Sequence, residues 1–518
     1  MQYQCHIIEP LAKANSFRLL QAQEEQLPSF AAARPLLPQP LWAGHEDAIA
    51  CYWKVWEIAF SNLRRPSAGS SFVANFIDTA FNDCLFLWDS VFILMFGRYG
   101  ARAFNFQRTL DNLYAKQHDD GFICREIRQS TGQDAWERFD PSSTGPNVLA
   151  WSEWEYYRNF ADRRRLEAVW PVLMAYHRWC RNFRTWPDGA YWSSGWGCGM
   201  DNQPRLRTDN RDYWRWHHGH MSWIDACCQQ VLSARLLAQM AGLLDRAGEA
   251  ADMRQEAAAL AETINRTMWD DQAGYYFDRY ADGALSGVKS VAGLWALLSQ
   301  VATPARAARL AEHLEDPRTF NRPHRVPTLA ADHAVYDPAG GYWRGGVWPP
   351  TNYMILRGLT QAGGQGRPDT GDASPVAGCF DDLAAAIARN HLDNVVAVFR
   401  DTGTVWENYA PEAAAPGKPA KPNFVGWSGL GPIAVLFEYV FGLRPAADRN
   451  RLLWDIRLTE EHGVSNYPFG AGGLLDLHCA ARRHAADKPV VTCRSNVPLE
   501  LEIRWPGGQE MRSLGPEA

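Results

Sequence analysis

The sequence lacks the short motifs that indicate a bound cofactor, a cradled phosphate or an activated serine. It contains no Walker loop, no glycine-rich dinucleotide fingerprint and no G-x-S-x-G nucleophile elbow. Zinc motifs such as H-E-x-x-H and C-x-x-C are also absent, so the group His217, His218 and His220 does not predict a metal site. We therefore expect neither a metal nor an organic cofactor.

Long apolar runs and an excess of one charge are missing as well. No stretch approaches the roughly 20 apolar residues of a membrane span, and residues 1–17 lack the basic-then-apolar layout of a secretion signal. The chain has a net charge of -6, and its 52 basic and 58 acidic residues are interspersed. This pattern argues against nucleic acid as a partner. The 11 cysteines are scattered and odd in number, as is typical of reduced thiols. These features predict a cytoplasmic protein that binds neither membrane nor nucleic acid.

Tryptophan, by contrast, is abundant. The chain has 23 tryptophans, and aromatic residues make up 12% of it. Because a buried indole N–H needs a hydrogen-bond partner, tryptophan is a costly way to fill a core. Two interpretations are open, aromatic core packing in a large protein or a sugar site in which flat rings stack on pyranose faces. Composition alone does not decide between them.

Apolar residues recur at three- and four-residue spacing through most of residues 46–450, which predicts a succession of amphipathic helices. A glycine followed by aromatic residues recurs between the helices, at Gly121, Gly189, Gly274, Gly341 and Gly403. Similar loops between helix pairs should gather on one face, either of an α-solenoid or of a closed toroid. Their spacing of roughly 60 to 85 residues is too irregular for a consensus repeat array. We therefore favour a toroid with the loops around one funnel.

The two ends of the chain have a different pattern. Residues 1–45 are proline-rich and weakly periodic, which predicts either an irregular arm or short strands packed on the helical part. Residues 451–518 contain short strand-like runs between turn residues and predict a small β-rich C-terminal segment. Two loops rich in Gly, Pro and Ala, 363–375 and 411–423, adjoin motif regions, and each is a candidate lid.

The motif S-G-W-G-C-G-M-D-N-Q-P-R places one carboxylate, that of Asp201, in a rigid aromatic loop. Its glycines, Gly199 among them, allow positive φ and close approach of the backbone to a ligand. Asn202 and Arg205 are near enough in sequence to position Asp201. The alternative is an Asx-turn in which Asp201 bonds its own backbone.

A second acid, Glu407, lies between Trp406 and Asn408 in the motif T-V-W-E-N-Y-A-P-E, just after a predicted helix. Aromatic neighbours exclude water, which disfavours the ionised form and moves a carboxyl pKa towards neutrality. The alternative is an ordinary surface glutamate at a turn.

Two further motifs combine aromatic with polar residues. G-Y-W-R-G-G-V-W-P-P-T-N-Y predicts either the aromatic wall of a site or a structural corner. Its members of interest are Tyr342, Trp343, Arg344 and Trp348. In F-L-W-D-S-V-F, Asp89 follows Trp88 within an apolar helix, where a buried acid must find partners. It would bond a substrate hydroxyl or cap a neighbouring helix.

Two carboxylates on well-formed loops, in an aromatic setting without a cofactor motif, are what glycoside hydrolysis requires. One acid protonates the leaving oxygen, while the other either activates water or attacks the anomeric carbon. The residues themselves therefore predict a glycosidase that uses Asp201 and Glu407.

Several motifs, taken in order, resemble glycoside hydrolase family 63, including its bacterial mannosylglycerate and glucosylglycerate hydrolases and its α-glucosidases. They are G-M-D-N-Q-P-R, Y-W-R-G-G-V-W-P-P-T-N-Y, W-E-N-Y-A-P-E and the G-W-S at 426–428, with W-D-S-V-F at 88–92 and K-Q-H-D-D-G-F at 116–122. The resemblance covers about residues 80–445 and implies an (α/α)6 barrel and an inverting mechanism. We expect an all-α fold in which this barrel occupies residues 46–450.

The resemblance also implies roles for individual residues. Asp201 would be the general acid with a raised pKa, and Glu407 an ionised general base roughly 6.5–9.5 Å away. The implied sugar contacts, with their neighbours in the same motifs, are Trp88, Asp89, Gln117, Gly199, Asn202, Tyr342, Trp343, Arg344, Trp348 and Trp427. We expect hydrolysis of a small α-glucoside or α-mannoside, either a glycosylglycerate-like solute or a short oligosaccharide.

The sequence leaves other functions open. A trehalase-like relative would share the barrel, and a sugar epimerase would use histidine pairs, for which the cluster at His217–His220 is a candidate. A non-catalytic sugar-binding toroid would not need the two acids. The family pattern has Pro where Gly346 stands and Ser where Gln203 stands, so the aglycone is open. The sugar and the oligomeric state, with a homo-oligomer as one option, are open too.

Overall fold

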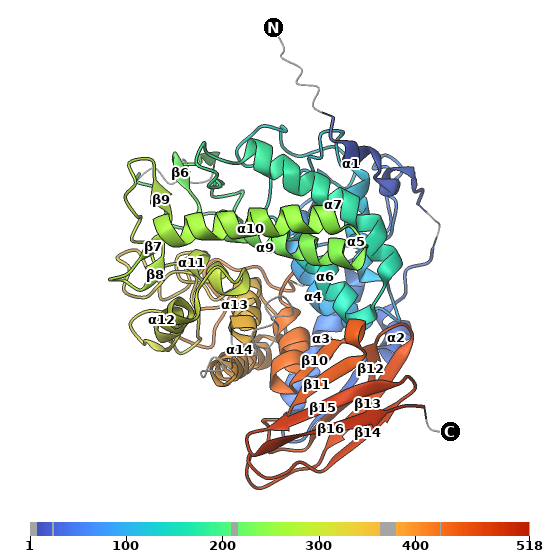
Figure 1. Cartoon of the computed structure of the whole chain (residues 1–518). Helices are drawn as coiled ribbons and strands as arrows, with labels where there is room; N and C mark the ends of the chain where they lie inside the picture. The colour runs from blue at the N-terminus through green and yellow to red at the C-terminus, as the bar shows by residue number, and fades with distance from the viewer. Residues whose placement is uncertain (1–7, 23–24, 209–215, 363–379, 425, 517–518) are drawn as a thin grey trace.

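The computed structural model describes residues 8–22, 25–208, 216–362, 380–424 and 426–516. The candidate lid at 363–375 lies outside these residues. Helices dominate from α3 (Glu46–Ser61) to the π-helix η5 (Leu430–Val440), and strands dominate from residue 443 onwards (Figure 1). The prediction of a helical protein with a β-rich C-terminal part is confirmed.

Ten α-helices are described between α3 and η5. They are α4 (Leu87–Gly97), α5 (Thr109–Ala115), α6 (Leu149–Phe160), α7 (Arg163–Phe183), α9 (Ile224–Leu243), α10 (Ala247–Thr267), α11 (Val291–Leu298), α12 (Pro304–Glu315), α13 (Pro349–Ala362) and α14 (Asp381–Thr402). Helix α4 packs on α6, α6 on α9, α9 on α11, α11 on α13, α13 on η5, and η5 on α4 again. These six described helices therefore close on one another in a ring.

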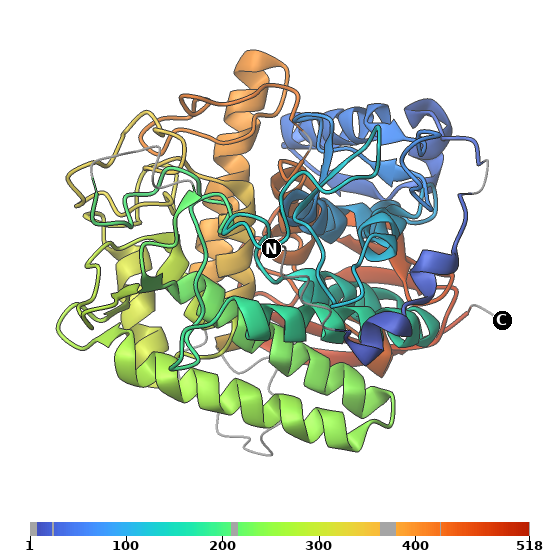
Figure 2. The ribbon, with the colours of Figure 1, turned by 90° about the horizontal axis from the view of Figure 1, so that it is seen from above.

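The sequences of the helices explain which of them lie inside. Every residue of α4, α11 and η5 is buried, as expected for helices that are apolar on all sides. Helix α10 buries only one stripe, consisting of small and aliphatic residues, and lies along α9 at the edge of the molecule (Figure 2). None of the described helices combines the length and apolarity needed to cross a membrane.

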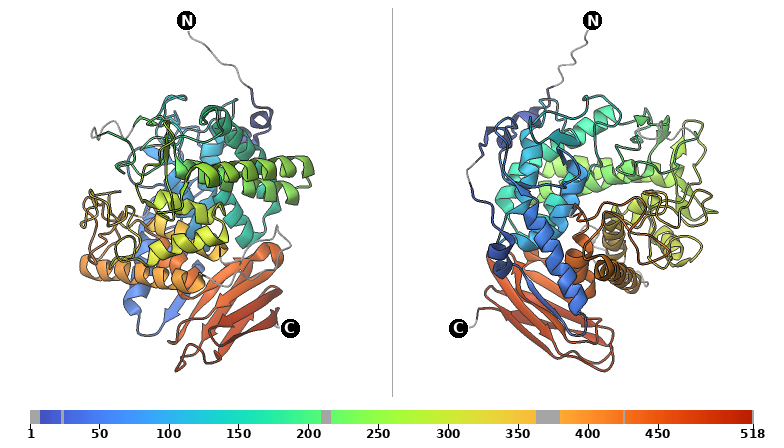
Figure 3. Two further views of the ribbon diagram at one scale, coloured as in Figure 1. Left: turned by 60° about the vertical axis from the view of Figure 1, so that its left-hand side comes forward. Right: turned by 180° about the vertical axis from the view of Figure 1, so that it is seen from behind.

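The C-terminal part consists of two four-stranded sheets, with strand orders β1-β12-β13-β14 and β10-β11-β15-β16. Their strands are β1 (Gln39–Trp42), β10 (Leu443–Ala446), β11 (Arg451–Asp455), β12 (His462–Phe469), β13 (Gly473–Cys479), β14 (Val491–Ser495), β15 (Leu499–Trp505) and β16 (Gly508–Leu514). The pair β11–β15 is parallel, and the other pairs in the two sheets are antiparallel. Both sheets lie at one end of the helical part (Figure 3).

The β part extends beyond the expected segment 451–518. Strand β10 begins at Leu443, directly after the π-helix, and the N-terminal arm supplies β1, which pairs with β12. Trp42 at the end of β1 is buried and packs edge-on against Phe441, with ring centroids 6.0 Å apart. The sequence allowed short strands in this arm, but pairing between segments more than 400 residues apart leaves no local pattern, so the partner strand β12 was not predicted.

The rest of the arm and the loops contain short elements. They are α1 (Pro10–Lys13), η1 (Ser16–Leu19), α2 (Phe30–Ala33), η2 (Arg34–Leu36), η3 (Arg98–Gly100), η4 (Phe106–Arg108), η6 (Ala447–Arg449), β2 (Leu63–Arg64), β3 (Phe76–Ile77), β4 (Cys84–Phe86), β5 (Glu126–Arg128), β6 (Met221–Ser222), β7 (Trp269–Asp270), β8 (Tyr275–Tyr276) and β9 (Arg279–Tyr280). Helix α1 packs on α7, which holds the arm against the helical part.

Candidate active site

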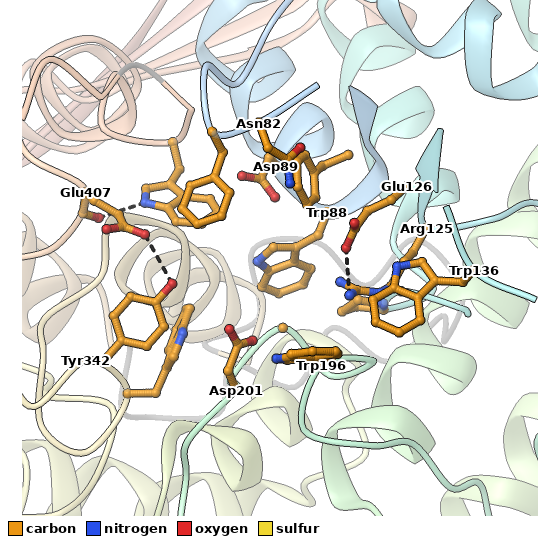
Figure 4. Close-up of a pocket in the computed structure, with 17 residues that line it drawn as sticks. Asn82, Trp88, Asp89, Arg125, Glu126, Trp136, Trp196, Asp201, Tyr342 and Glu407 are labelled. Carbon is orange, nitrogen blue, oxygen red and sulfur yellow. Dashed lines mark hydrogen bonds and ion pairs between the residues drawn. The ribbon is translucent and has the colours of Figure 1, made fainter. Parts of the chain in front are cut away.

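Both predicted acids, Asp201 and Glu407, line one cavity of about 470 Å³ (Figure 4). The lining comes from loops and helix starts that are far apart in sequence. It comprises Phe81, Asn82, Phe86, Trp88, Asp89, Arg125, Glu126, Trp136, Gly145, Pro146, Trp196, Gly199, Asp201, Tyr342, Trp343, Glu407 and Trp427. A cavity with aromatic walls and a few convergent carboxyl groups has the character of a small-ligand site.

The loop that carries Asp201 is fixed by its neighbours. Gly199 has φ +75°, and a side chain there would press on the indole of Trp88 at 3.3 Å, so glycine lets the two approach. Asn202 donates to the carbonyl of Gly341 at 3.0 Å and accepts from the Trp343 N–H at 2.9 Å. Asn202 therefore ties the Asp201 loop to the aromatic loop opposite and does not itself line the cavity.

Arg205 has a different role from the one suggested by its sequence position. Its guanidinium is fully buried and makes paired hydrogen bonds to Asp225, at 2.7 and 2.8 Å, and to Asp278, at 2.8 and 2.6 Å. It also lies over the Trp223 ring, 4.3 Å from the centroid. Arg205 therefore anchors the end of the Asp201 loop to the start of α9 and is not a cavity residue.

Replacing Arg205 should destabilise the protein strongly. In Arg205→Met two buried carboxylates lose their counter-charge, a change that typically costs about 3–5 kcal/mol of unfolding free energy. The matched control is Arg207→Met, because Arg207 pairs with Asp282 at the surface, where such pairs contribute about 0–1 kcal/mol. Urea denaturation of both variants measures the difference. Equal midpoints for the two variants would contradict the anchoring role.

Glu407 is positioned by three separate segments. It follows α14, which ends at Thr402 and is capped by Gly403 in the left-handed region with φ 73°. The Tyr342 hydroxyl donates to Oε1 at 3.2 Å and the Lys421 N–H to Oε2 at 3.2 Å, while the Trp427 indole donates to the backbone carbonyl at 2.8 Å. The candidate lid 411–423 thus folds back on Glu407 through Lys421. The carboxylate is oriented by fixed donors.

Burial dominates the electrostatics of Glu407. The residue is only 4% exposed, and loss of solvation raises its pKa to about 7. The hydrogen bonds from Lys421 and Tyr342 oppose this rise in pKa, and the nearby charge of Asp201 adds to it. Glu407 is therefore about half ionised near pH 7, which agrees with the shift expected from its aromatic neighbours, whereas the resemblance implied an ionised base.

Asp89 and Trp88 lie in the first turn of α4, at the centre of the cavity wall (Figure 4). Burial raises the pKa of Asp89 well above its usual range, and the charges of Glu126 and Glu407 raise it further. The indole N–H of Trp88 has no hydrogen-bond partner among the described residues. Both groups are thus available to the hydroxyls of a ligand.

Eight of the twelve predicted site residues line the cavity, and four do not. Trp348 stacks behind Trp343, with centroids 3.7 Å apart and planes 7° apart, and supports the wall from outside. Gln117 is buried and donates to the carbonyls of Gly121 and Val172. Arg344 and Asn202 also stand outside the lining. Gln117 belongs to one of the family motifs, but its side chain bonds neighbouring backbone carbonyls and does not face the cavity.

Sequence reasoning missed one end of the cavity, which we call the tryptophan end and define as Arg125, Glu126, Trp136 and Trp196. Glu126 in β5 pairs with Phe86 in β4, and this pairing places it beside the start of α4. The signal that could have found it is D-D-G-F-I-C-R-E-I, one of the recurrent glycine–aromatic loops, which carries both an acid and an arginine.

The histidine cluster lies outside the described lining of this cavity. The ligand nitrogens of His217, His218 and His220 lie within 4.8 Å of one another. Nδ1 of His217 accepts from the Gly219 N–H, and burial lowers the pKa of His218 to about 4. A sugar epimerase built on these histidines would therefore not use the cavity that holds the two acids.

Comparison with known proteins identifies the family of the chain. Residues 84–428 match the family described as the mannosylglycerate hydrolase MGH1-like glycoside hydrolase domain. The chain belongs to this family. It is a glycoside hydrolase, and the resemblance to glycoside hydrolase family 63 is confirmed.

The relatives include enzymes with different names. A probable mannosyl-oligosaccharide glucosidase of Schizosaccharomyces pombe is 24% identical over 289 residues, which cover 51% of this chain and 34% of that protein. A mannosylglycerate hydrolase of Thermus thermophilus is 26% identical over 344 residues, which cover 54% and 81%. The crystal structure of a family 63 mannosylglycerate hydrolase from Thermus thermophilus in complex with glucose matches with a TM-score of 0.57 and 22% identity, over 75% of this chain and 99% of that one. The last match shows a shared fold.

Proposed function

We propose that this glycoside hydrolase is an inverting α-glycosidase, with Asp201 as general acid and Glu407 as general base. The observation that carries the proposal is the arrangement of these two carboxyl groups, which reach one aromatic cavity from separate, well-anchored loops (Figure 4). We further propose that the ring of six helices and its outer partners form an (α/α)6 barrel, since that barrel gathers loops of this kind around one funnel. The substrate is a small α-glucoside or α-mannoside.

The hydrolytic reaction follows from the positions of Glu407 and Asp201 in the cavity. The Glu407 carboxylate removes a proton from water as the water oxygen bonds to the anomeric carbon. The Asp201 carboxyl gives its proton to the glycosidic oxygen as the bond between that oxygen and the anomeric carbon breaks. Tyr342 and the Lys421 N–H hold Glu407 in the orientation this step requires. Trp88, Trp343 and Trp427 supply ring surfaces for the bound sugar.

The names of the relatives support α-glucosides and α-mannosides as substrate classes, because a glucosidase and a mannosylglycerate hydrolase occur among them. A cytoplasmic location and the oligomeric state remain proposals from the sequence. The nine cysteines among the described residues all have free thiols, which is consistent with a reducing compartment.

The proposal is tested by a proton NMR time course on glucosylglycerate, mannosylglycerate, trehalose and the common glucobioses. An inverting α-glycosidase releases the β-anomer first, because water attacks the face opposite the leaving group. Initial release of the α-anomer would contradict inversion. Ligand-induced shifts without any hydrolysis would contradict the enzymatic role and favour a sugar-binding protein.

The pH dependence should report on Glu407. Because a general base must be ionised, kcat/KM should fall as the pH decreases through about 7. Tyr342→Phe removes a donor that stabilises the carboxylate and so holds the pKa down. Without it the pKa rises, and the loss of activity should begin at a higher pH.

The measurement is the initial rate at low substrate concentration over a range of pH values around 7. The control is Tyr276→Phe, because the Tyr276 hydroxyl donates to Asn265 on α10 and lies outside the cavity lining. The acid limb should stay in place in Tyr276→Phe and move upwards in Tyr342→Phe. An unmoved limb in Tyr342→Phe would assign the titration to another group.

A further inference from the structure

We propose that the tryptophan end of the cavity is a subsite for a neutral glycosyl leaving group, so that the preferred substrates are α-linked disaccharides or longer oligosaccharides and not glycosylglycerates. The inference rests on the proposed function and specifies the part of the substrate that the family assignment leaves open. It is carried by the position, the charge balance and the hydrogen-bonding capacity of four side chains.

The position follows from the stereochemistry of inversion. The base and its water lie on one side of the anomeric carbon, and the leaving group lies on the other side next to the acid. Glu407 and Tyr342 stand at one end of the cavity, whereas Arg125, Glu126 and Trp136 stand at the opposite end, with Trp196 next to Asp201 (Figure 4). A leaving group protonated by Asp201 therefore extends towards the tryptophan end.

Arg125 at this end is held by three contacts. Its Nη2 lies 2.6 Å from Oε1 of Glu126, its Nε donates to the Ser142 carbonyl at 2.7 Å, and its guanidinium lies over the Trp136 ring, 4.8 Å from the centroid. Glu126 is itself buried, and the Arg125 side chain is mostly so. This ion pair is a fixed, partly desolvated feature of the cavity wall.

The charge balance disfavours an anionic leaving group. Arg125 is the cationic residue of the described lining, and its charge is already compensated by Glu126. The other ionisable carboxyl groups of the lining are those of Asp89, Asp201 and Glu407, none of which attracts a carboxylate. A glycerate carboxylate would therefore have to compete with Glu126 for Arg125, because the described lining offers it no second cation.

The same groups suit a neutral sugar. A hydroxyl is both a donor and an acceptor, and the Arg125–Glu126 pair presents donors and acceptors side by side. Trp136 and Trp196 lie edge to face with centroids 5.1 Å apart and offer ring surface for a pyranose. The Trp136 indole N–H has no hydrogen-bond partner among the described residues and is a further donor for a hydroxyl.

The experiment compares three leaving groups on each of two sugars, glucose and mannose. Initial rates are measured with α-glucosyl and α-mannosyl fluorides, with the corresponding glycosylglycerates, and with α-linked glucobioses and mannobioses. We expect kcat/KM for the best disaccharide to exceed that for the glycosylglycerate of the same sugar by about tenfold or more. A preference for the glycosylglycerate would overturn the inference.

Glu126→Gln tests the charge argument. The substitution keeps the size of the side chain and releases the charge of Arg125, so the ratio of glycosylglycerate to disaccharide kcat/KM should rise by about 10- to 100-fold. The matched control is Glu57→Gln on the surface of α3, where Glu57 pairs with Lys54, and it should leave the ratio unchanged. An unchanged ratio in Glu126→Gln would overturn the role of the ion pair.

Trp136→Ala tests the sugar surface. It should lose about tenfold more kcat/KM on the disaccharide than on the fluoride, which has no glycosyl leaving group, and Trp136→Phe should recover part of that loss. Equal losses on both substrates would overturn the subsite. If wild type hydrolysed the fluorides without preferring disaccharides, only the subsite proposal would be overturned. Failure to hydrolyse any fluoride would overturn the proposed function as well.

Discussion

Asp201→Asn should lower kcat on α-linked disaccharides by about 10²–10⁴-fold, the usual contribution of a general acid. Asparagine has nearly the same shape but cannot give a proton to the leaving oxygen. The loop should keep its conformation, because Asn202 bonds the opposite loop and Gln203 donates to the Thr328 carbonyl at 2.9 Å, both independently of the carboxyl group. The loss should therefore appear in kcat with little change in unfolding midpoint.

The leaving group provides the sharper comparison for this variant. Fluoride departs with little help from a proton, so Asp201→Asn should lose much less activity on an α-glycosyl fluoride than on a disaccharide. Asp245→Asn is the matched control, since Asp245 is an exposed surface residue that pairs with Arg163. Near-native turnover of disaccharides by Asp201→Asn would show that another group donates the proton.

Glu407→Gln should be equally damaging but with a different pattern. Water must be activated whatever the leaving group, so kcat should fall by about 10²–10⁴-fold on both the disaccharide and the fluoride. The acid limb near pH 7 should disappear from any residual activity, because its titrating group is gone. Initial rates on the two substrates at several pH values measure both effects.

The unfolding stability of Glu407→Gln shows whether its loss of activity reflects lost catalysis or lost folding. Burial raises the pKa of Glu407 from 4.5 to about 7, so ionisation of this group destabilises the folded state increasingly above about pH 4.5 and fully above about pH 7. The neutral amide removes that penalty, and Glu407→Gln should be at least as stable as wild type at alkaline pH. Glu57→Gln is again the control for the same chemical change at the surface. A variant that kept the acid limb would place the base elsewhere.

Much of the site was predictable because its residues belong to contiguous motifs. Gly199 and Asp201 share one loop, and Tyr342 and Trp343 share another, and all four residues line the cavity. The burial of Glu407 between aromatic residues also followed from its neighbours. Local rules of this kind depend on spacing along the chain, which a sequence displays directly.

The same local reasoning failed where a residue's neighbours in space are distant in sequence. Arg205 follows Asp201 by four positions, yet its guanidinium turns away to Asp225 and Asp278. Gln117 belongs to a family motif, yet its amide is used by the carbonyls of Gly121 and Val172. A buried polar group goes where its hydrogen bonds can be satisfied, and only the packed structure determines where that is.

By itself, the sequence determined the helical periodicity, the aromatic loops, the two acids and the glycoside hydrolase family. Only the tertiary structure decided that β1 from the arm completes a C-terminal sheet and that Arg125 and Glu126 form the far end of the cavity. It also decided that Tyr342, which is distant in sequence, donates to the Glu407 carboxylate and lowers its pKa. The reason is physical: propensity and periodicity act between neighbours in the chain, whereas desolvation, ion pairing and strand pairing depend on groups that folding brings together from far apart.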